Sequence, residues 1–563
     1  MGKNGPDPKY SVKSLPLPIS TSSTDWHPTG GWRHLRPVMN PKAAPCRHGC
    51  PAGIDIRAMT DFISRGDYFH AWKTVLADSP FPGTCGRVCY YPCESNCSRA
   101  AYDDPVAIHQ LERFGFDRGY RAGYIDPVIN KKLGSKPQKV AVVGSGPAGM
   151  SCAYHLARQG YNVTVFERES EPGGILRYGI PAYRLPPEII DKEINVITSL
   201  GVKIETGREL LADLDLKSLG RFDASFLAIG AHSPHRIGLE TPPGDNGLLL
   251  GLDFLNSVAH GLKKLPGRRV AVVGGGNTAV DAARTVRRLG GEAVIVYRRT
   301  ETEMPAHPRE VKAAKAEDIH MVFLAAPIDL KLENGKIAGL NCQKMKLGRP
   351  EADGRRRPQP VRGSTMTVDV DSVIIATGEV PDIDGLPGRL ISERGFLKVD
   401  TGFMTPSRGL FAGGDAVSGA GTVVDAIAHG KEAARRIDLF LGGEGEIGTE
   451  LIGRADVRPH PAYFTRKGET RTKELNPGEA AAGFDEVVSG YDPASAAIEA
   501  DRCFMCGTCN GCGVCFVFCP DAAILPDGNE FKINYDYCKG CGVCAEECPR
   551  AVIDLEEESR WRI

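Results

Sequence analysis

The sequence predicts a multidomain α/β protein, in which two units built on parallel sheets lie between two cysteine-rich modules. Two glycine-rich strand–turn–helix segments, KVAVVGSGPAGM and RRVAVVGGGNTAVD, mark the central body. Six of the 18 cysteines lie at positions 46 to 97 and ten at 503 to 548. A length of 563 residues agrees with about three or four domains. The N-terminal module is expected to be helical and the C-terminal module to be a small α+β domain.

Composition and charge exclude several classes of protein. Apolar residues make up 42% and charged residues 25%, which is typical of globular chains. With 69 basic and 70 acidic residues, nucleic acid or an anionic membrane is not expected as the main partner. No membrane span and no signal peptide is expected, so a cytoplasmic location is predicted. In a reducing compartment, many cysteines indicate metal ligation more than disulfides.

The C-terminal cysteines repeat one spacing twice. Each run is C-x2-C-x2-C-x3-C-P, which is typical of [4Fe–4S] ferredoxins, and the fourth cysteine of each run serves the other cluster. A zinc ribbon would use two C-x2-C pairs instead. Cys503 and Cys506 extend the spacing upstream, so a shifted register or spare thiols stay open. The predicted ligand sets are Cys509, Cys512, Cys515 and Cys548 for one cluster, and Cys538, Cys541, Cys544 and Cys519 for the other.

The first glycine-rich segment is typical of a dinucleotide site. A β-branched strand leads into Gly144-x-Gly146-x-x-Gly149 and a helix, and Glu167 ends the following strand. Glycines allow the backbone to approach a pyrophosphate at the helix N-terminus, and the acid binds ribose hydroxyls.

The second glycine-rich segment has the same layout with a different strand end. Gly274 and Gly276 precede Asn277 and Thr278 at the start of a helix. The next strand ends in Arg298 and Arg299 instead of an acid. Arginine there can accommodate a 2′-phosphate, which favours NADP(H), while NAD(H) stays open.

Together with SVIIATG and GLFAGGDA further on, these segments resemble the two-dinucleotide flavoprotein disulfide-reductase superfold. That resemblance implies FAD on the first unit plus the C-terminal segment, and NAD(P)H on the inserted second unit. Thr422 and Val423 open a helix whose N-terminus can face flavin atoms. The expected FAD contacts are Gly144, Gly146, Pro147, Ala148, Gly149, Glu167, Gly174, Arg177, Gly414, Asp415, Thr422 and Val423.

A redox cysteine pair beside the flavin is absent from the sequence. The segments EPGGILRYGIPAYRLP and GGGNTAVDAAR contain no cysteine, and Cys152 and Cys342 are expected to be buried structural thiols. Electrons are therefore expected to leave the flavin through iron–sulfur clusters.

The N-terminal cysteines, with GGILRYGIPAYRL and VYRRTETEMPAHPREV, resemble the glutamate synthase small-subunit family over about residues 40 to 440. That family includes the N-terminal half of dihydropyrimidine dehydrogenase, and one branch carries a C-terminal ferredoxin module. The resemblance implies Cys50, Cys89, Cys93 and Glu112 as ligands of one cluster, and Cys46 and Cys97 as two ligands of another. The family's upstream C-x2-C pair is missing, so one or two N-terminal clusters are expected, the second needing Cys85 or non-cysteine ligands.

The predicted function is transfer of electrons between NAD(P)(H), FAD and [4Fe–4S] clusters, with no catalytic acid or base. The partner is expected to be the catalytic subunit of a larger redox complex, such as a 2-oxoacid:acceptor enzyme of the phenylglyoxylate dehydrogenase type, or a ferredoxin-type protein. The alternatives are a free-standing NAD(P)H:ferredoxin-type oxidoreductase and a cluster-bearing scaffold. The predicted domains are a 1–39 extension, a 40–130 helical iron–sulfur domain, FAD-binding parts at 137–265 and 385–440, an NAD(P)H-binding domain at 266–384, a 441–500 linker and a 501–563 ferredoxin domain.

Overall fold

A computed structural model describes residues 28–123, 134–234, 237–239, 247–351, 353–449, 457–528 and 530–561. The chain divides into two compact units. The smaller unit holds residues up to Lys42, residues 457–464 and residues from Met505 onward. The larger unit holds Ala43–Asp456 and Thr465–Phe504. The predicted fold class is confirmed, and each unit is described by itself below.

The larger unit begins with a bundle of short helices. These are α1 (Pro45–Gly49), α2 (Ile56–Ser64), α3 (Tyr68–Asp78), α4 (Pro82–Val88), α5 (Pro92–Ser95) and α6 (Ile108–Arg121). Proline at the first helical position starts α1, α4 and α5, where a missing N–H costs nothing. Asp55 and Asp67 cap α2 and α3 by accepting backbone N–H groups. These short helices leave turns at which the N-terminal cysteines stand.

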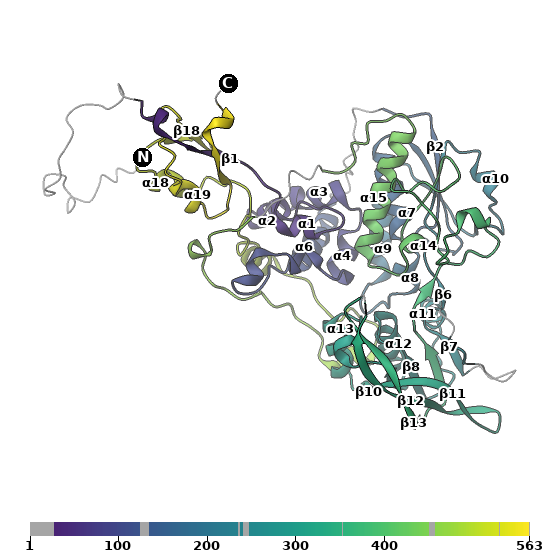
Figure 1. Ribbon diagram of the computed structural model, residues 1–563. Helices are drawn as coiled ribbons and strands as arrows, with labels where there is room; N and C mark the ends of the chain where they lie inside the picture. The colour runs from purple at the N-terminus through teal and green to yellow at the C-terminus, as the bar shows by residue number, and fades with distance from the viewer. Residues whose placement is uncertain are drawn as a thin grey trace. The chain divides into compact units, whose positions relative to one another are not determined.

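The first parallel sheet has the strand order β16-β5-β2-β3-β4. Its strands are β2 (Lys139–Val143), β3 (Asn162–Phe166), β4 (Lys203–Glu205), β5 (Ala224–Leu227) and β16 (Leu410–Ala412). Strand β16 comes from far along the chain and pairs in parallel with β5. Helices α7 (Pro147–Arg158) and α15 (Val423–Phe440) lie side by side against this sheet (Figure 1). Gly430 permits this close approach, because a Cβ there would stand 2.1 Å from the Ala148 carbonyl oxygen.

Short helices complete the first domain: α8 (Ile175–Tyr178), α9 (Pro187–Thr198), α10 (Leu216–Leu219) and α14 (Asp415–Ser418).

The second parallel sheet has the order β10-β9-β8-β14-β7. Its strands are β7 (Leu248–Leu250), β8 (Arg269–Val273), β9 (Glu292–Tyr297), β10 (His320–Phe323) and β14 (Ser372–Ile375), with helices α11 (Gly251–Ala259), α12 (Asn277–Arg288) and α13 (Pro308–Ala316). A three-stranded antiparallel sheet, β11 (Ala325–Glu333), β12 (Lys336–Pro350) and β13 (Arg356–Val368), is inserted before β14. The short strands β6 (Ser233–Pro234) and β15 (Glu379–Val380) pair where the chain passes between the two domains.

The segment expected as a 441–500 linker contains helices of its own. These are α16 (Pro477–Ala482) and α17 (Pro493–Ala500), and α17 packs on α2 and α6 of the helical bundle. Its buried Glu499 accepts hydrogen bonds from the backbone N–H of Ala107 and of Thr470, each at 2.8 Å. Residues 465–500 of this segment belong to the larger unit, whereas residues 457–464 belong to the smaller unit.

The smaller unit is an α+β module. It contains α18 (Val514–Phe518), β17 (Ile524–Asp527), β18 (Glu530–Ile533), α19 (Val543–Glu546) and β19 (Ile553–Glu557). Strand β1 (Leu35–Met39), expected as part of an extension, pairs antiparallel with β19. Arg33 reinforces this pairing through a buried ion pair with Glu558. The part of the predicted extension before residue 28 lies outside the described residues.

Candidate functional site: two nucleotide motifs on one cavity beside buried cysteines

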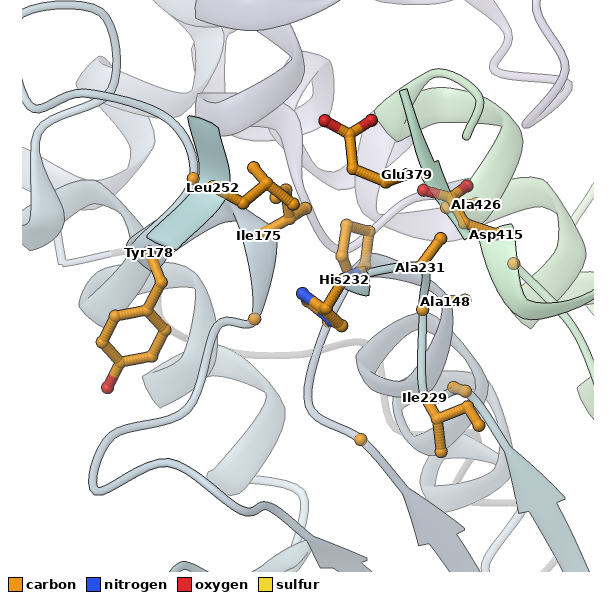
Figure 2. A pocket seen from close by; sticks show the side chains of 18 of the residues that line it. Ala148, Ile175, Tyr178, Ile229, Ala231, His232, Leu252, Glu379, Asp415 and Ala426 are labelled. Carbon is orange, nitrogen blue, oxygen red and sulfur yellow. The ribbon is translucent and has the colours of Figure 1, made fainter. Parts of the chain in front are cut away.

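One cavity of about 340 Å³ is lined by both glycine-rich segments. It lies at the carboxyl ends of the parallel strands, where α/β folds bind their ligands. Figure 2 shows Glu379 and Asp415 around it, with His232 between the apolar side chains of Ile175, Leu252 and Ala231. Of the predicted residues it is lined by Gly144, Gly146, Pro147, Ala148, Glu167, Gly174, Gly414, Asp415, Thr422, Val423, Asn277 and Thr278.

The three glycines of the first segment have different roles. Gly144 has a φ of +101°, and a Cβ on it would stand 2.3 Å from the Ala228 carbonyl oxygen. A Cβ on Gly149 would stand 1.9 Å from the Gly144 carbonyl oxygen. Gly146 has an ordinary φ of −68°, and a Cβ there would meet no protein atom within 4 Å. Two glycines therefore serve the fold, while the third keeps open a space that fits a pyrophosphate at the start of α7.

The carboxylate of Glu167 is hydrogen-bonded to the first glycine-rich segment. Its Oε2 accepts hydrogen bonds from the backbone N–H of Ser145 at 2.9 Å and from the Ser145 hydroxyl. Its Oε1 accepts from the Glu169 N–H at 2.9 Å. The carboxylate stands at the end of β3, and it is held in the position from which an acid binds ribose hydroxyls.

Asp415 lies on the opposite side of the first sheet's carboxyl edge. It begins α14 and accepts a hydrogen bond from Gly421 N–H at 3.3 Å. Burial, with the nearby carboxylates of Glu379 and Asp425, raises the pKa of Asp415 to about 6. Thr422 caps α15 by accepting from Asp425 N–H, so the 18-residue helix begins at the cavity. A helix N-terminus favours electron-rich flavin atoms, and hydroxyl groups can pair with the carboxyl of Asp415.

Arg177 is placed differently from the sequence prediction. Its guanidinium pairs with Glu171 at 3.0 Å and with Asp191, and its Nε donates to the Pro172 carbonyl oxygen at 2.8 Å. It is not among the residues that line the cavity. These contacts make Arg177 an anchor of the turn around Gly173, and its contact with the flavin stays a prediction.

The second glycine-rich segment repeats the division of roles. A Cβ on Gly274 would stand 2.1 Å from the Ala376 carbonyl oxygen, whereas Gly276 has open space around it. Asn277, the first residue of α12, donates to the Tyr90 hydroxyl and accepts from His307 N–H at 3.0 Å. Thr278 hydrogen-bonds Glu379 across the cavity wall.

The two arginines after β9 differ in their exposure to solvent. Arg298 is exposed. Arg299 is 4% exposed, donates from Nε to the Arg356 carbonyl oxygen at 2.8 Å and pairs with Glu351 at 2.7 Å. Arg299 thus attaches the inserted sheet to the end of β9, whereas the side chain of Arg298 is exposed to solvent.

Sequence analysis missed several cavity residues. His232 follows β5, and burial with the charge of Arg168 lowers its pKa to about 4, so it is neutral at pH 7. Glu379 follows β14, and burial raises its pKa. Each lies in the segment that follows a parallel strand, at the β6–β15 pair, so the rule that ligands bind beyond the carboxyl ends of such strands could have identified them.

Four N-terminal cysteines gather around Glu112 inside the helical bundle. Cys50, Cys89, Cys93 and also Cys85 are buried, and the electrostatic influence of Glu112 reaches each of their thiols. Burial raises the pKa of all four thiols and that of Glu112. Glu112 Oε1 is buried without a hydrogen-bond partner among the described residues. An orphaned acceptor among thiols fits a ligand of an iron–sulfur cluster.

This cysteine group adjoins the cavity. Val88 and Tyr90, the neighbours of Cys89 in the chain, both line the cavity. Helix α4, which carries Cys85 and leads to Cys89, is fixed to α9 by Glu193. That carboxylate accepts from Gly83 N–H at 2.6 Å and from Thr84 N–H at 3.0 Å.

Apart from Cys503 and Cys506, the remaining cysteines occupy three kinds of position. Cys46 and Cys97 are half-buried and pack against the helical bundle. Cys152 and Cys342 are fully buried, as expected for structural thiols. In the smaller unit, one small cavity is lined by Cys509, Cys512, Cys515 and Cys548, and a second by Cys519, Cys538, Cys541 and Cys544. Each set is the one that the ferredoxin spacing predicts for a single cluster.

No helix in the described parts of the chain is both long and apolar enough to cross a bilayer.

Comparison with known proteins adds three family matches and several relatives. Residues 138–430 match pyridine nucleotide-disulphide oxidoreductases, residues 38–124 match dihydropyrimidine dehydrogenase domain II with a 4Fe–4S cluster, and residues 531–554 match a 4Fe–4S binding domain. The β subunit of NADP(+)-dependent formate dehydrogenase of Moorella thermoacetica is 38% identical over 82% of this chain and 70% of its own. The β subunit of the NADPH–Fe(3+) oxidoreductase of Geobacter sulfurreducens is 36% identical over 82% of this chain and 75% of its own. The small chain of Escherichia coli NADPH glutamate synthase is 35% identical over 70% of this chain and 88% of its own.

Proposed function

Because the chain belongs to the glutamate synthase small-chain-like family of FAD- and NAD(P)H-dependent iron–sulfur oxidoreductases, we propose that it exchanges electrons between NADPH and a partner catalytic subunit. It is an NAD(P)H-dependent oxidoreductase subunit with FAD-binding and 4Fe–4S domains. The three relatives above carry names of subunits or chains of larger enzymes, which supports a partner subunit. The specific complex, including the 2-oxoacid:acceptor type, stays a prediction of the sequence.

The observation that carries the proposal is the position of Cys89. It stands between Val88 and Tyr90, which line the cavity of the dinucleotide motifs. A cluster held by Cys89 would therefore lie beside the cavity, within the same unit. The orphaned Glu112 Oε1 beside Cys89 supports a cluster at that place.

When FAD, a nicotinamide nucleotide and the clusters are bound, the chemistry supplied is hydride exchange and one-electron transfer. The chain itself binds and orients. We assign the pyrophosphate of FAD to the open space at Gly146, its ribose to Glu167 and its polyol hydroxyls to Asp415. Apolar side chains such as Ile175 and Leu252 exclude water from the cavity.

NADPH is the proposed nucleotide. Arg298 is exposed beyond β9, at the strand end where a 2′-phosphate is recognised in this fold. A guanidinium can bind a phosphate with two parallel hydrogen bonds, which a 2′-hydroxyl cannot match. The names of the three relatives contain NADP(+) or NADPH, which supports the same choice.

Anaerobic stopped-flow reduction of the purified chain tests the proposal. NADPH and NADH are compared at equal concentration while flavin and iron–sulfur absorbance are followed separately. We expect NADPH to bleach the flavin faster, with loss of iron–sulfur absorbance close behind. In the R298A variant the preference for NADPH over NADH should fall by about 10- to 150-fold, since a charge-assisted hydrogen bond contributes about 1.5–3 kcal/mol.

Arg268 provides the matched control. It is an exposed arginine just before β8, at the amino edge of the same sheet, and it pairs with Glu292 at 3.1 Å. The R268A variant should keep the wild-type preference. Equal rates with the two nucleotides in wild type would refute the assignment of Arg298. If neither nucleotide bleached the flavin, the proposed nicotinamide-nucleotide site would be refuted.

A further inference from the structure

Three consecutive apolar residues of the smaller unit are exposed on the helix α18. Phe516, Val517 and Phe518 have exposed fractions of 42%, 73% and 49%. They are the three residues between Cys515 and Cys519 in the first cysteine run. Exposed apolar side chains that stand singly are common on protein surfaces, whereas a run of them in a small domain indicates an interaction site unless the fold requires it.

The second cysteine run shows that the fold does not require apolar residues at these positions. Helices α18 and α19 begin in the same way, each after a glycine with positive φ, +78° at Gly513 and +83° at Gly542. The three residues of the second run that correspond to the exposed apolar ones are Ala545, Glu546 and Glu547. The same turn of helix is therefore compatible with charged residues, so the apolar run on α18 needs another explanation.

The apolar run adjoins both small cysteine cavities of this unit. Cys515 on α18 lines the first cavity, and Cys519, the C-cap of α18, lines the second. Phe531 of β18 stacks on Phe516, with ring centroids 6.1 Å apart, and also lines the first cavity. A protein that docks on α18 would therefore lie beside the cysteines of both predicted clusters, where an electron has a short distance to travel.

Exposed carboxylates surround this apolar centre. Helix α19, which packs on α18 (Figure 1), carries the exposed Glu546. Asp527 and Glu530 pair across the end of the β17–β18 hairpin, next to Phe531. In the described parts of the chain these three carboxylates form no ion pair, whereas Asp521 pairs with Lys539 at 2.8 Å. Uncompensated negative charge around an apolar centre complements a surface that is apolar at its centre and basic at its rim.

We propose that Phe516, Val517, Phe518 and Phe531, called here the α18 patch, form the docking surface for the partner subunit. The electron-exchanging face of that subunit is then apolar at its centre and basic at its rim. This inference rests on the proposed function, which supplies the partner. A second copy of this chain fits less well, because a two-fold contact would bring the same carboxylates against one another.

Cytochrome c, a basic haem protein, is the probe for this surface chemistry. Calorimetric titration of the purified full chain with cytochrome c at low ionic strength gives a Kd without any turnover. V517S should raise this Kd about 5-fold or more, because truncation at the centre of an interface weakens binding most. E546Q should raise it by a smaller factor that disappears at high salt, where exposed charges are screened. Both side chains are exposed, so iron content and thermal melts should match wild type.

Leu525 provides the matched control. It is 45% exposed, lies in the same hairpin and pairs with Lys532 across the strands. Successive residues of a strand point to opposite faces, so Leu525 and Lys532 lie on the face away from the Phe531 ring. L525S should therefore leave the Kd for cytochrome c unchanged.

Electron transfer provides a second measurement that does not depend on the nucleotide. When the dithionite-reduced chain is mixed with cytochrome c, haem reduction should be about 5-fold slower or more in V517S at subsaturating cytochrome c. Reduction of the flavin and clusters by NADPH should not change in this variant. Because dithionite bypasses the nucleotide, failure of NADPH to reduce the flavin would refute the proposed function and leave this test intact.

Four results would overturn the proposal. The first is an unchanged Kd for cytochrome c in V517S, and the second is an equal rise in L525S. The third is slower reduction of the clusters by NADPH in V517S, which would show that the α18 patch serves transfer within the chain. The fourth is a dimer in gel filtration of wild type that V517S abolishes, which would make a second copy the occupant.

Discussion

Replacing Gly146 with alanine separates ligand binding from folding at the first dinucleotide motif. The backbone of Gly146 has a φ of −68° and a ψ of 180°, which alanine adopts without strain, and a Cβ would meet no protein atom within 4 Å. The FAD-free variant should therefore be as stable as wild type, or more stable by about 0.4–1 kcal/mol through a less flexible unfolded chain. The new methyl group occupies the space assigned to the pyrophosphate.

The expected loss of FAD affinity follows from the hydrogen bonds at stake. A bond from a backbone N–H to a charged phosphate contributes about 1.5–3 kcal/mol, and the methyl group displaces at least one. The Kd for FAD should rise about 10- to 150-fold. Fluorescence titration of the FAD-stripped protein measures this, and its thermal melt measures stability.

The matched control is G149A. Its Cβ would stand 1.9 Å from the Gly144 carbonyl oxygen, so the start of α7 must move and stability should fall by at least about 2 kcal/mol. A G146A protein that melts like G149A would show that Gly146 is needed for packing. A G146A protein that binds FAD with the wild-type Kd would refute the assignment of the pyrophosphate space.

Three further substitutions test the site. In FAD-free protein, D415N should not change stability below about pH 3, where Asp415 is protonated in both the folded and the unfolded chain. The gain should begin above the ordinary pKa of 3.8 and reach about 3 kcal/mol above pH 6, because the folded pKa is about 6 and the buried charge is then unfavourable. Urea unfolding across pH measures this, and equal gains at pH 3 and pH 8 would contradict it. E112A should lose about four iron per chain, whereas E112Q should retain them because its amide keeps an oxygen ligand. Iron analysis and EPR measure this, and equal iron in the two variants would exclude Glu112 as a ligand. R299A should lower stability by about 1–3 kcal/mol, because the contacts to Glu351 and Arg356 are lost. The preference for NADPH should not change, and a lost preference would show that Arg299 binds the phosphate instead of Arg298.

Local motifs made much of the fold predictable. The β-branched strands before Gly144 and Gly274, and the helices that follow, depend on interactions between near neighbours in sequence. The repeated C-x2-C-x2-C-x3-C-P spacing likewise predicted which thiols would share a cavity in the smaller unit. Helix α17 and strand β1 were missed, because their partners lie hundreds of residues away along the chain.

At the site, too, some residues were predictable from local spacing, and others were distinguished only by the fold. Spacing identified Gly146, Glu167 and Asp415, since each follows a strand in a recognisable segment. It could not distinguish Arg298 from Arg299, because their difference arises from Glu351 and the inserted sheet, which only folding brings to Arg299.

The sequence by itself determined the two dinucleotide motifs, the cysteines that share a cavity in the smaller unit, and the family, because each depends on residue type at short spacing. Tertiary structure decided that Cys89 adjoins the nucleotide cavity, and that Arg502 binds the loop after Cys97. The physical reason is that burial and long-range hydrogen bonds choose the neighbours of a side chain. The buried pair of Glu499 and Arg502, which fixes the end of α17 on the helical bundle, is one such choice.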